Sequence, residues 1–303
     1  MKILIVVVRY NVPLSESQTI SGLAQAFQNH PRLTDEMGVL IWDNSPEALT
    51  APLLPFPIEY RHSSKNQGVS GAYNGAIPVA SERNIPWMLL LDQDTSITGQ
   101  YLLAMLENAV SLAPQVEIAA IVPTVRVGDF VVSPREARFN SHRAYTAGAG
   151  IATGEPFAIN SGSVMRVEAL RKIGGFSTEF WLDYSDMYVY HQFFLLGMKV
   201  WRASEVELQH EMTIMDYDKL MAPWRYRNFL EAEGAFHDLY KGPLENATQS
   251  LRLMVRAILQ RMRHKNPEFS RTTWSYFLQR LSMRKKTRLQ RWHASEGRYA
   301  LKK

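Results

Sequence analysis

Short hydrophobic runs alternate with stretches of helical spacing along the first two thirds of the chain. The runs are rich in Val, Ile and Leu, which is typical of strands that a sheet buries on both faces. Strands that alternate with helices predict an α/β fold with a mostly parallel, Rossmann-like sheet. The predicted strands cover 2–8, 38–42, 57–62, 87–91, 118–123, 158–164 and 199–207; the predicted helices cover 16–29, 71–83, 99–113, 167–173 and a stretch after Asp186; a long loop or hairpin is expected at 126–155.

The last part of the chain has a different pattern, with apolar residues at helical spacing beside Arg and Lys. It predicts two amphipathic helices, 248–263 and 274–292. The apolar stripe of the first holds Leu251, Met254, Val255, Ile258 and Met262, and that of the second holds Trp274, Phe277, Leu278, Leu281, Leu289 and Trp292. We therefore expect one domain at 1–240, made of two halves at about 1–125 and about 126–240, followed by a helical appendage at 241–303.

Charge divides the chain in the same way. Residues 241–303 hold 16 Lys and Arg against 3 Asp and Glu, a net charge of +13, whereas the other 240 residues hold 18 against 26, a net charge of −8. A basic tail on an acidic body suggests a polyanionic partner. Two interpretations stay open: the two helices pack on the body with a solvated basic face, or they lie on an anionic membrane surface.

Composition narrows the classes of protein. Hydrophobic residues make up 46% and charged residues 21%, as in ordinary globular proteins, so a disordered chain is excluded. The absence of cysteine excludes disulfide scaffolds, thiolate metal sites and cysteine nucleophiles. No run approaches the roughly 18 apolar residues of a membrane span, and residues 2–8 lack the length and cleavage site of a signal peptide. We expect a cytoplasmic protein, peripheral at the inner face of the cytoplasmic membrane.

Polar clusters follow three of the predicted strands: Tyr10-Asn11, Asp43-Asn44 and Asp92-Gln93-Asp94. In open α/β sheets ligands bind beyond the carboxyl ends of the strands. Each cluster alone is an ordinary turn signal, but three together favour a binding site. The two carboxylates of Asp92 and Asp94 suit Mg²⁺ or Mn²⁺ together with substrate phosphates.

These clusters belong to an ordered set of motifs that resembles the family 2 inverting glycosyltransferases. The motifs are VVVRYN at 6–11, WDNSP at 42–46, NQGVSGAYNGA at 66–76, LLLDQDT at 89–95, NSGSVM at 160–165 and GGFSTEFWLDYSD at 174–186. The resemblance covers about residues 1–215 and implies a GT-A-type nucleotide-sugar-binding fold. The triplet followed by Thr, with the glycine-bearing loop, is similar to the bacterial rhamnosyltransferases in particular.

The resemblance implies a donor-binding role for residues of the first three motifs. Asp43 matches the acid that contacts the pyrimidine base, whose imide N–H a carboxylate can accept. Tyr10 lies where the first loop flanks the base, although Arg9 replaces the usual small residue. Asn66 and Gly68 match the loop that closes on the nucleotide and the donor sugar. Asn74 belongs to the same motif, with the alternative that it faces the helix interior.

Further residues match the groups around the diphosphate. Asp92 matches the acid that faces the donor ribose or sugar, and Asp94 matches the metal ligand. His210 follows the strand predicted at 199–207, where many relatives have a second metal contact. Arg227 lies in WRYRN at 224–228, which resembles a segment of rhamnosyltransferases, and a cation there would neutralise the leaving diphosphate.

The second half is expected to supply the base that removes a proton from the acceptor hydroxyl. Asp186 aligns with the family's catalytic acid, but Ser185 stands where a Glu usually precedes it. Asp183 lies three residues earlier and is therefore a rival.

The sequence thus predicts a metal-dependent glycosyltransferase that transfers L-rhamnose from dTDP-rhamnose to a lipid-linked, O-antigen-like polysaccharide precursor. Two other functions stay open: a sugar-1-phosphate nucleotidyltransferase, and a non-catalytic protein that binds a nucleotide sugar or a polyanion. The nucleotidyltransferase interpretation expects a Gly-rich, basic loop after the first strand, whereas RYNVPLSES follows here. A nucleic-acid partner is not expected.

Overall fold

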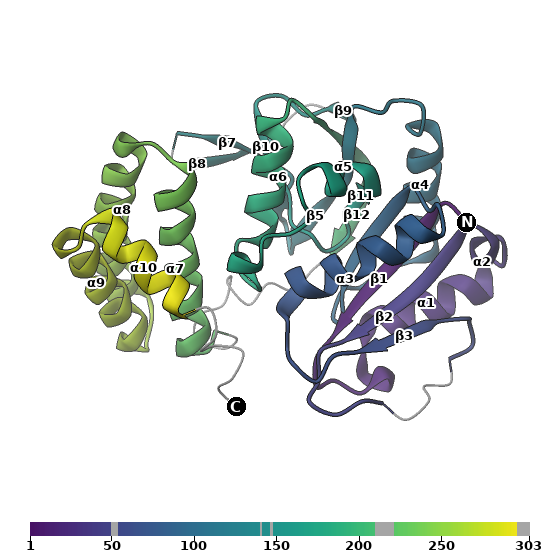
Figure 1. Ribbon diagram of the computed structural model, residues 1–303, viewed down its shortest axis with the longest axis horizontal. Helices are drawn as coiled ribbons and strands as arrows, with labels where there is room; N and C mark the ends of the chain where they lie inside the picture. The colour runs from purple at the N-terminus through teal and green to yellow at the C-terminus, as the bar shows by residue number, and fades with distance from the viewer. Residues whose placement is uncertain (50–53, 140, 146–147, 210–220, 296–303) are drawn as a thin grey trace. The chain divides into compact units, whose positions relative to one another are not determined.

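A large mixed sheet forms the centre of the first part of the chain (Figure 1). The structure is a computed structural model that describes residues 1–49, 54–139, 141–145, 148–209 and 221–295. Nine strands of the described residues join in this sheet in the order β3-β2-β1-β4-β11-β5-β12-β9, with β6 paired to β5. These strands are β1 (Ile3–Arg9), β2 (Met37–Asp43), β3 (Glu59–His62), β4 (Trp87–Asp92), β5 (Ile118–Val127), β6 (Phe130–Ser133), β9 (Gly150–Ile151), β11 (Val164–Arg166) and β12 (Lys199–Gln209).

Parallel pairing dominates the half of the sheet that carries the polar clusters. Strands β2 and β4 both run parallel to β1, and β3 runs parallel to β2. Strand β12 is parallel to β5, whereas β11 lies antiparallel between β4 and β5. Every residue of β1 is buried, because helices cover both faces of the sheet, and this explains its continuous apolar sequence. The predicted α/β fold of the GT-A type is confirmed.

Helices α3, α5 and α6 share one hydrophobic core with one face of the sheet. Ala-rich α3 packs closely against Leu4, Val6 and Val8 of β1. On the other face, α1 packs against α4 and α2. The helices are α1 (Gln18–Asn29), α2 (Arg32–Glu36), α3 (Gly68–Glu82), α4 (Gly99–Ser111), α5 (Val167–Lys172) and α6 (Ser185–Leu195), with short 3-10 turns η1 (Leu14–Glu16) and η2 (Thr178–Phe180).

The segment between β5 and β11 is more ordered than a single loop or hairpin. It contains β6, β9 and a separate three-stranded sheet in the order β10-β7-β8, made by β7 (Arg135–Arg138), β8 (Ser141–Ala144) and β10 (Glu155–Phe157). The strand predicted at 158–164 was wrong, because those residues form a tight turn and β11 begins only at Val164. Hydrogen bonds from Gly162 N to Leu90 O (2.8 Å) and from Leu90 N to Ser163 O (3.0 Å) hold this turn on β4.

The chain forms two compact units: residues 1–138 with 142–211, and residues 139–141 with 212–303. The second unit contains α7 (Pro223–Tyr240), α8 (Pro243–Arg263), α9 (Pro267–Ser282) and α10 (Lys285–Ser295). The division lies near residue 212 rather than at residue 240, because α7 packs against α8, α9 and α10. The single helix predicted at 274–292 was wrong, since extended backbone at Met283 ends α9 and α10 follows.

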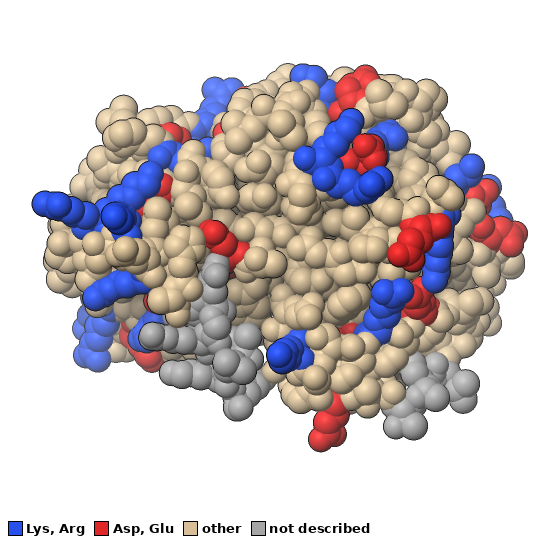
Figure 2. Space-filling model, in the orientation of Figure 1, with Lys and Arg blue, Asp and Glu red and all other residues tan. Residues whose placement is uncertain are grey.

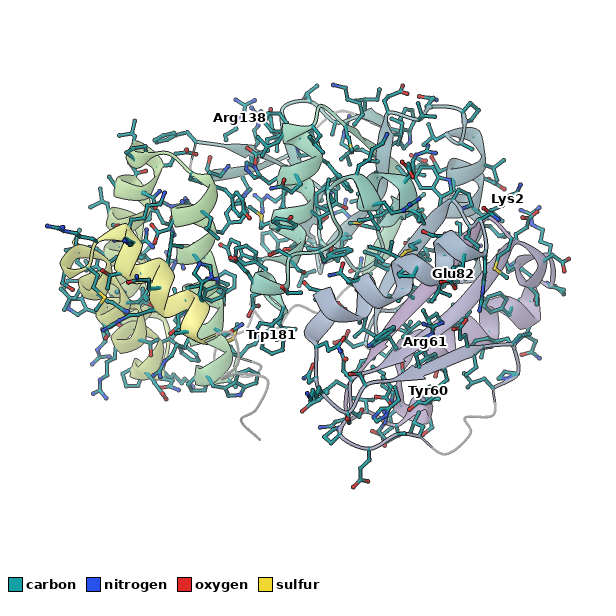
Figure 3. The ribbon with its side chains drawn as sticks, in the orientation of Figure 1. Lys2, Tyr60, Arg61, Glu82, Arg138 and Trp181 are labelled. Atoms are coloured by element: carbon teal, nitrogen blue, oxygen red, sulfur yellow. The ribbon has the colours of Figure 1, made fainter. Side chains whose placement is uncertain are left out.

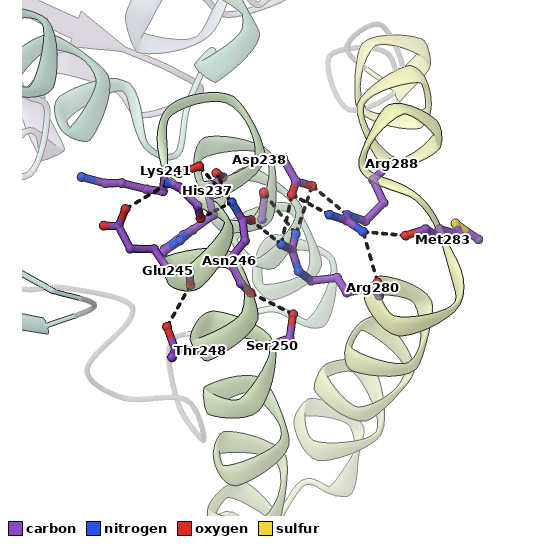
Figure 4. Close-up of polar contacts among 12 residues, drawn as sticks. His237, Asp238, Lys241, Glu245, Asn246, Thr248, Ser250, Arg280, Met283 and Arg288 are labelled. Carbon is purple, nitrogen blue, oxygen red and sulfur yellow. Dashed lines mark hydrogen bonds and ion pairs between the residues drawn. The ribbon is translucent and has the colours of Figure 1, made fainter.

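Buried ion pairs hold the four helices together (Figure 4). The Asp238 carboxylate, on α7, accepts hydrogen bonds from Arg280 Nη2 of α9 at 3.1 Å and from Arg288 Nη2 of α10 at 2.7 Å. Arg280 also donates to Asn246 Oδ1 of α8 at 2.9 Å. The Asp238 carboxylate therefore links α7, α9 and α10 directly, and Arg280 extends the network to α8. Within the described residues, no helix combines the length and the apolar composition needed to span a bilayer.

Candidate active site

The three polar clusters lie at one edge of the sheet, as the parallel strands require. Arg9, the last residue of β1, is in register with Asp43 of β2, and Val8 is in register with Asp92 of β4. The residues that follow these strands therefore emerge together, at the carboxyl edge where ligands bind in open α/β sheets. The structure thus places Tyr10, Asp43 and the 92–95 loop side by side.

A buried ion pair lies between β1 and β2. Asp43 is 0% exposed, and its carboxylate accepts hydrogen bonds from Arg9 Nη1 (2.5 Å), the Tyr60 hydroxyl (2.6 Å) and Ser45 N (2.9 Å). Burial would raise the pKa of the Asp43 carboxyl, but the hydrogen bonds from Ser45 and Tyr60 and the charge of Arg9 outweigh burial and lower it. Figure 3 marks Tyr60 on β3. The Asp43 carboxylate is charged and hydrogen-bonded within its own chain. Its contact with the pyrimidine base of a nucleotide stays a prediction.

The loop after β4 is held from three sides. Thr19 Oγ1 of α1 donates to Asp92 O at 2.5 Å, and Ser161 Oγ accepts from Asp92 N at 3.0 Å. Tyr10 N donates to Gln93 Oε1 at 2.8 Å, so the first loop is tied to the same turn. The Asp94 side chain is exposed, whereas that of Asp92 is partly buried. A fixed backbone therefore presents one carboxylate to solvent and the other to the interior of the site.

The glycine-bearing loop enters α3 with a conformation that only glycine adopts easily. Gly68 has φ +66° and lies against the backbone of Trp181, so that a Cβ atom there would overlap the Trp181 carbonyl. Asn66 Oδ1 accepts a hydrogen bond from Gly68 N at 2.9 Å, and Asn44 Nδ2 donates to Gly68 O at 2.9 Å. Asn66 and Gly68 are thus brought to the same edge as the second polar cluster.

Asn74, six residues after Gly68 on α3, has a structural role in the described residues. Its Nδ2 donates to Phe176 O at 2.8 Å, and its Oδ1 accepts from Phe176 N at 2.7 Å. Both polar ends of the amide are used within the chain, which favours the interpretation that Asn74 faces the interior.

Residues 178–184 connect this loop to the candidate base. Ser70 Oγ of α3 donates to Phe180 O at 2.6 Å, and Ser70 N donates to Trp181 O at 3.2 Å. Tyr184 has the left-handed backbone (φ +66°), which is costly for a non-glycine residue and turns the chain into α6. Asp186 follows in the first turn of α6, where its Oδ1 accepts from Met187 N at 2.8 Å.

Carboxylates concentrate around Asp186. Burial raises the pKa of the Asp186 carboxyl to about 7, and the negative charges of Asp183 and Asp92 act in the same direction. Burial also raises the pKa of the Tyr73 hydroxyl well above its usual value, with contributions from Asp92, Asp186 and Asp94. The structure therefore brings Asp92, Asp94, Asp183 and Asp186 to one site. A carboxyl with a pKa near 7 is suited to general base catalysis at neutral pH.

The side chains that could ligate a metal here, Asp92 and Asp94, fit an ion that takes its other ligands from a substrate. Among the described residues, no group of three or more His, Asp or Glu side chains could enclose a metal ion. An exposed Asp94 beside Asp92 suits Mg²⁺ or Mn²⁺, which proteins often bind through one or two carboxylates plus phosphate oxygens. His210 lies outside the described residues. Arg227 is exposed on α7, in the second unit.

Sequence reasoning missed the groups that hold the site in place. Thr19, Ser161 and Ser70 fix the two loops, and Tyr60 completes the hydrogen bonding of Asp43. Only Ser70 and Ser161 lie inside the motifs, and hydroxyl groups there gave no sign of their distant partners. Arg9 was noticed as a departure from the family pattern, but its partner was not predicted.

Comparison with known proteins agrees with this architecture. The crystal structure of S. aureus TarS 1-349 in complex with UDP-GlcNAc matches at a TM-score of 0.52 and 16% identity, over 92% of this chain and 81% of that one. The crystal structure of S. aureus TarS matches at 0.50 and 16% identity over 88% of this chain, which spans only 44% of that protein. At such identities the matches show a shared fold. No curated protein sequence matches.

The family itself is shown by sequence. The model of glycosyl transferase family 2 matches residues 5–174, more than half of the chain. The match includes Tyr10, Asp43, the 66–76 loop and the Asp92–Asp94 triplet, and it ends before Asp183 and Asp186. The chain therefore belongs to glycosyl transferase family 2.

Proposed function

We propose that the protein is an inverting glycosyltransferase that transfers L-rhamnose from dTDP-rhamnose to a hydroxyl group of a lipid-linked polysaccharide precursor. The observation that carries the reaction is Asp186, a partly buried carboxyl with a pKa of about 7 beside the Asp92–Asp94 loop. The choice of rhamnose is supported by the resemblance of the 66–76, 92–95 and 224–228 segments to rhamnosyltransferases.

In the proposed reaction Asp186 accepts the proton of the acceptor hydroxyl while the oxygen bonds to the anomeric carbon. The bond from that carbon to the nucleoside diphosphate breaks on the opposite side, so the configuration inverts. Asp183 and Asp92 keep the Asp186 carboxylate basic, because a second negative charge nearby raises its proton affinity. Asp186 is fixed by the first turn of α6, which reduces the motion needed to reach the acceptor.

We propose that Asp94, with Asp92 beside it, holds Mg²⁺ or Mn²⁺ against the donor diphosphate. The ion would neutralise the charge that develops on the leaving group. The exposed position of Asp94 supports this role, since a metal that bridges to substrate needs open coordination positions.

The proposed acceptor is a glycan on a lipid carrier at the inner face of the cytoplasmic membrane. The basic C-terminal unit supports this proposal, because the lipid carriers of glycans bear phosphate and lie in anionic membranes.

A donor panel tests the proposal. Release of nucleoside diphosphate is measured with dTDP-rhamnose and with UDP-GlcNAc, the nucleotide sugar named for the TarS complex, each with and without Mn²⁺. We expect turnover with dTDP-rhamnose only when the metal is present. Turnover with UDP-GlcNAc alone would keep the enzyme class and overturn the donor.

Matched variants test the metal site. Asp94→Ala should abolish the Mn²⁺ dependence of donor binding, whereas Asp129→Ala, which removes another exposed carboxylate of the same unit, should not. Unchanged donor affinity and metal dependence in Asp94→Ala would overturn the assignment.

A further inference from the structure

Helix α8 exposes its apolar side chains. Leu251 is 55% exposed, Ile258 50% and Met262 77%, and Leu244 and Val255 are exposed as well. At about 100° per residue these five positions fall within a sector of roughly 60°. The sequence predicted a stripe through four of these positions, all but Leu244, and the structure places them on the outer surface of the helix rather than in a core.

The opposite side of α8 is buried and partly polar. Gln249, Leu253, Ala257 and Gln260 are buried there. Gln260 Nε2 donates to the Tyr226 hydroxyl at 2.7 Å, and Thr273 donates to Gln260 Oε1 at 2.7 Å. The helix therefore has the reverse of the usual arrangement, in which the most apolar face is buried. Its folding within the unit does not use the exposed stripe.

Helix α9 has a second exposed apolar stripe. Trp274, Leu278 and Leu281 recur at spacings of four and three residues, and each is more than 40% exposed. Contiguous exposed apolar surface of this kind marks a site of protein or membrane interaction. Tryptophan is enriched where proteins meet the bilayer interface.

Basic side chains flank the stripe of α8. Arg252 and Arg263 lie on one side of the sector and Arg261 on the other, and all three are exposed. Long basic side chains in these positions can reach lipid phosphates while their methylene groups cover apolar surface. Figure 2 shows Lys and Arg side chains spread over the α7–α10 unit on the face in view, with fewer Asp and Glu.

We propose that the exposed apolar faces of α8 and α9 bind an anionic membrane surface, with the helices lying in the interface. The charge of the segment selects this partner, because residues 241–303 carry a net charge of +13 while five large apolar side chains project from α8 between arginines. A nucleic acid would use the arginines but not the apolar sector. The interaction is independent of the glycosyl transfer reaction, so its test requires no donor.

The test is sedimentation of the full-length chain with vesicles at low and high salt. The vesicles contain phosphatidylcholine alone or phosphatidylcholine mixed with phosphatidylglycerol. We expect binding to the mixed vesicles at low salt, weakened at high salt. The double variant Ile258→Glu/Met262→Glu should bind at least about tenfold more weakly, because apolar burial and charge attraction are both lost. The control Val116→Glu, which changes another residue that is 77% exposed, should bind like the wild type.

A second variant separates the two parts of the interaction. Arg252→Gln/Arg261→Gln should bind more weakly at low salt and lose part of its salt dependence. Circular dichroism and thermal unfolding check that each variant is folded, which the exposure of all substituted side chains favours.

Three results would overturn the proposal. The first is folded wild-type protein that does not sediment with the mixed vesicles at low salt. The second is Ile258→Glu/Met262→Glu protein that binds as well as Val116→Glu protein. The third is wild-type protein that forms dimers through these residues in analytical ultracentrifugation and does not bind vesicles, which would assign the face to a second copy of the chain.

Discussion

Replacing the partly buried Asp186 with Asn should lower activity and raise stability, because both effects come from removing one negative charge. The pKa of the carboxyl is raised from 3.8 to about 7, so ionising it in the folded protein costs about 4 kcal/mol more than in the unfolded chain. For an acid whose pKa rises on folding, the free energy of unfolding is highest below the unfolded pKa, where the carboxyl is protonated in both states. That stability is lost as the pH rises through the folded pKa. Asn is uncharged at every pH, so the Asn variant avoids this loss of stability.

Urea denaturation of both proteins at a series of pH values measures this effect. We expect Asp186→Asn to be the more stable protein at pH 8, and its advantage over the wild type to grow by about 2–3 kcal/mol between pH 5 and pH 8. An advantage that stays constant with pH, or that shrinks as pH rises, would refute the reasoning, because the cost would not then come from ionisation of Asp186.

The activity of the same pair gives the second readout. Because the base must be deprotonated, transfer by the wild type should rise with pH through about 7 and reach only about a tenth of its maximum at pH 6. Asp186→Asn should lose at least roughly 10²-fold in transfer while it still binds donor. Asp183→Asn removes a neighbouring negative charge, so the rise should move to lower pH. An inactive Asp183→Asn beside an active Asp186→Asn would exchange the two roles.

Three further predictions follow from other buried contacts. Arg9→Ala leaves the Asp43 carboxylate buried without its cation and should cost about 3–5 kcal/mol of stability by urea denaturation; a loss below about 1 kcal/mol would contradict a buried ion pair. Gly68→Ala meets both the positive φ and the Trp181 carbonyl, so it should lower the melting temperature and transfer together; wild-type values for both would show that the loop adapts. His237 has its pKa lowered by burial to about 4, so the wild type should lose stability as the pH falls from about 6.5 to 4, and His237→Asn should lose less; equal acid sensitivity in urea titrations would exclude His237 as the cause.

The gathering of the donor residues could be predicted from sequence because parallel strands carry their carboxyl ends to one edge. Three apolar runs followed by Tyr10, Asp43 and Asp92 were enough to place those residues together, and the register of β1 with β2 and β4 confirms it. The second half was less predictable. Its short strands β7 to β10 have mixed burial and no clear period, so they were expected as a loop or a hairpin.

The state of each carboxylate could not be predicted, since it depends on neighbours that are distant in sequence. Asp43 is held charged by Arg9, 34 residues away, and by Tyr60. The pKa of Asp186 is raised to about 7 by burial and by the charges of Asp183 and of Asp92, which belongs to another element. The sequence has the same residue type, aspartate, at both positions. Their environments nevertheless shift the two pKa values in opposite directions.

The amphipathic pattern of α8 shows a related gap between sequence and structure. Periodicity established that Leu251, Val255, Ile258 and Met262 share a face, and the structure agrees. Periodicity does not say what covers that face. The buried side is stabilised instead by hydrogen bonds of Gln260 and by ion pairs such as Arg256 with Glu233, at 2.7 Å, which no apolar period can reveal.

The loop that matches the donor motif is hydrogen-bonded to the segment that leads to Asp186. Ser70, two residues after Gly68, donates to the carbonyls of Phe180 and Trp181, and Gly68 lies directly against the Trp181 backbone. Four residues, 182–185, separate Trp181 from Asp186, and Tyr184 among them has the left-handed backbone. Displacing the loop at 66–71 would therefore break two hydrogen bonds that position the chain before Asp186. The same contacts explain how Gly68 can affect a carboxylate more than 100 residues away: a displacement of the loop at 66–71 reaches the chain before Asp186 through the carbonyls of Phe180 and Trp181.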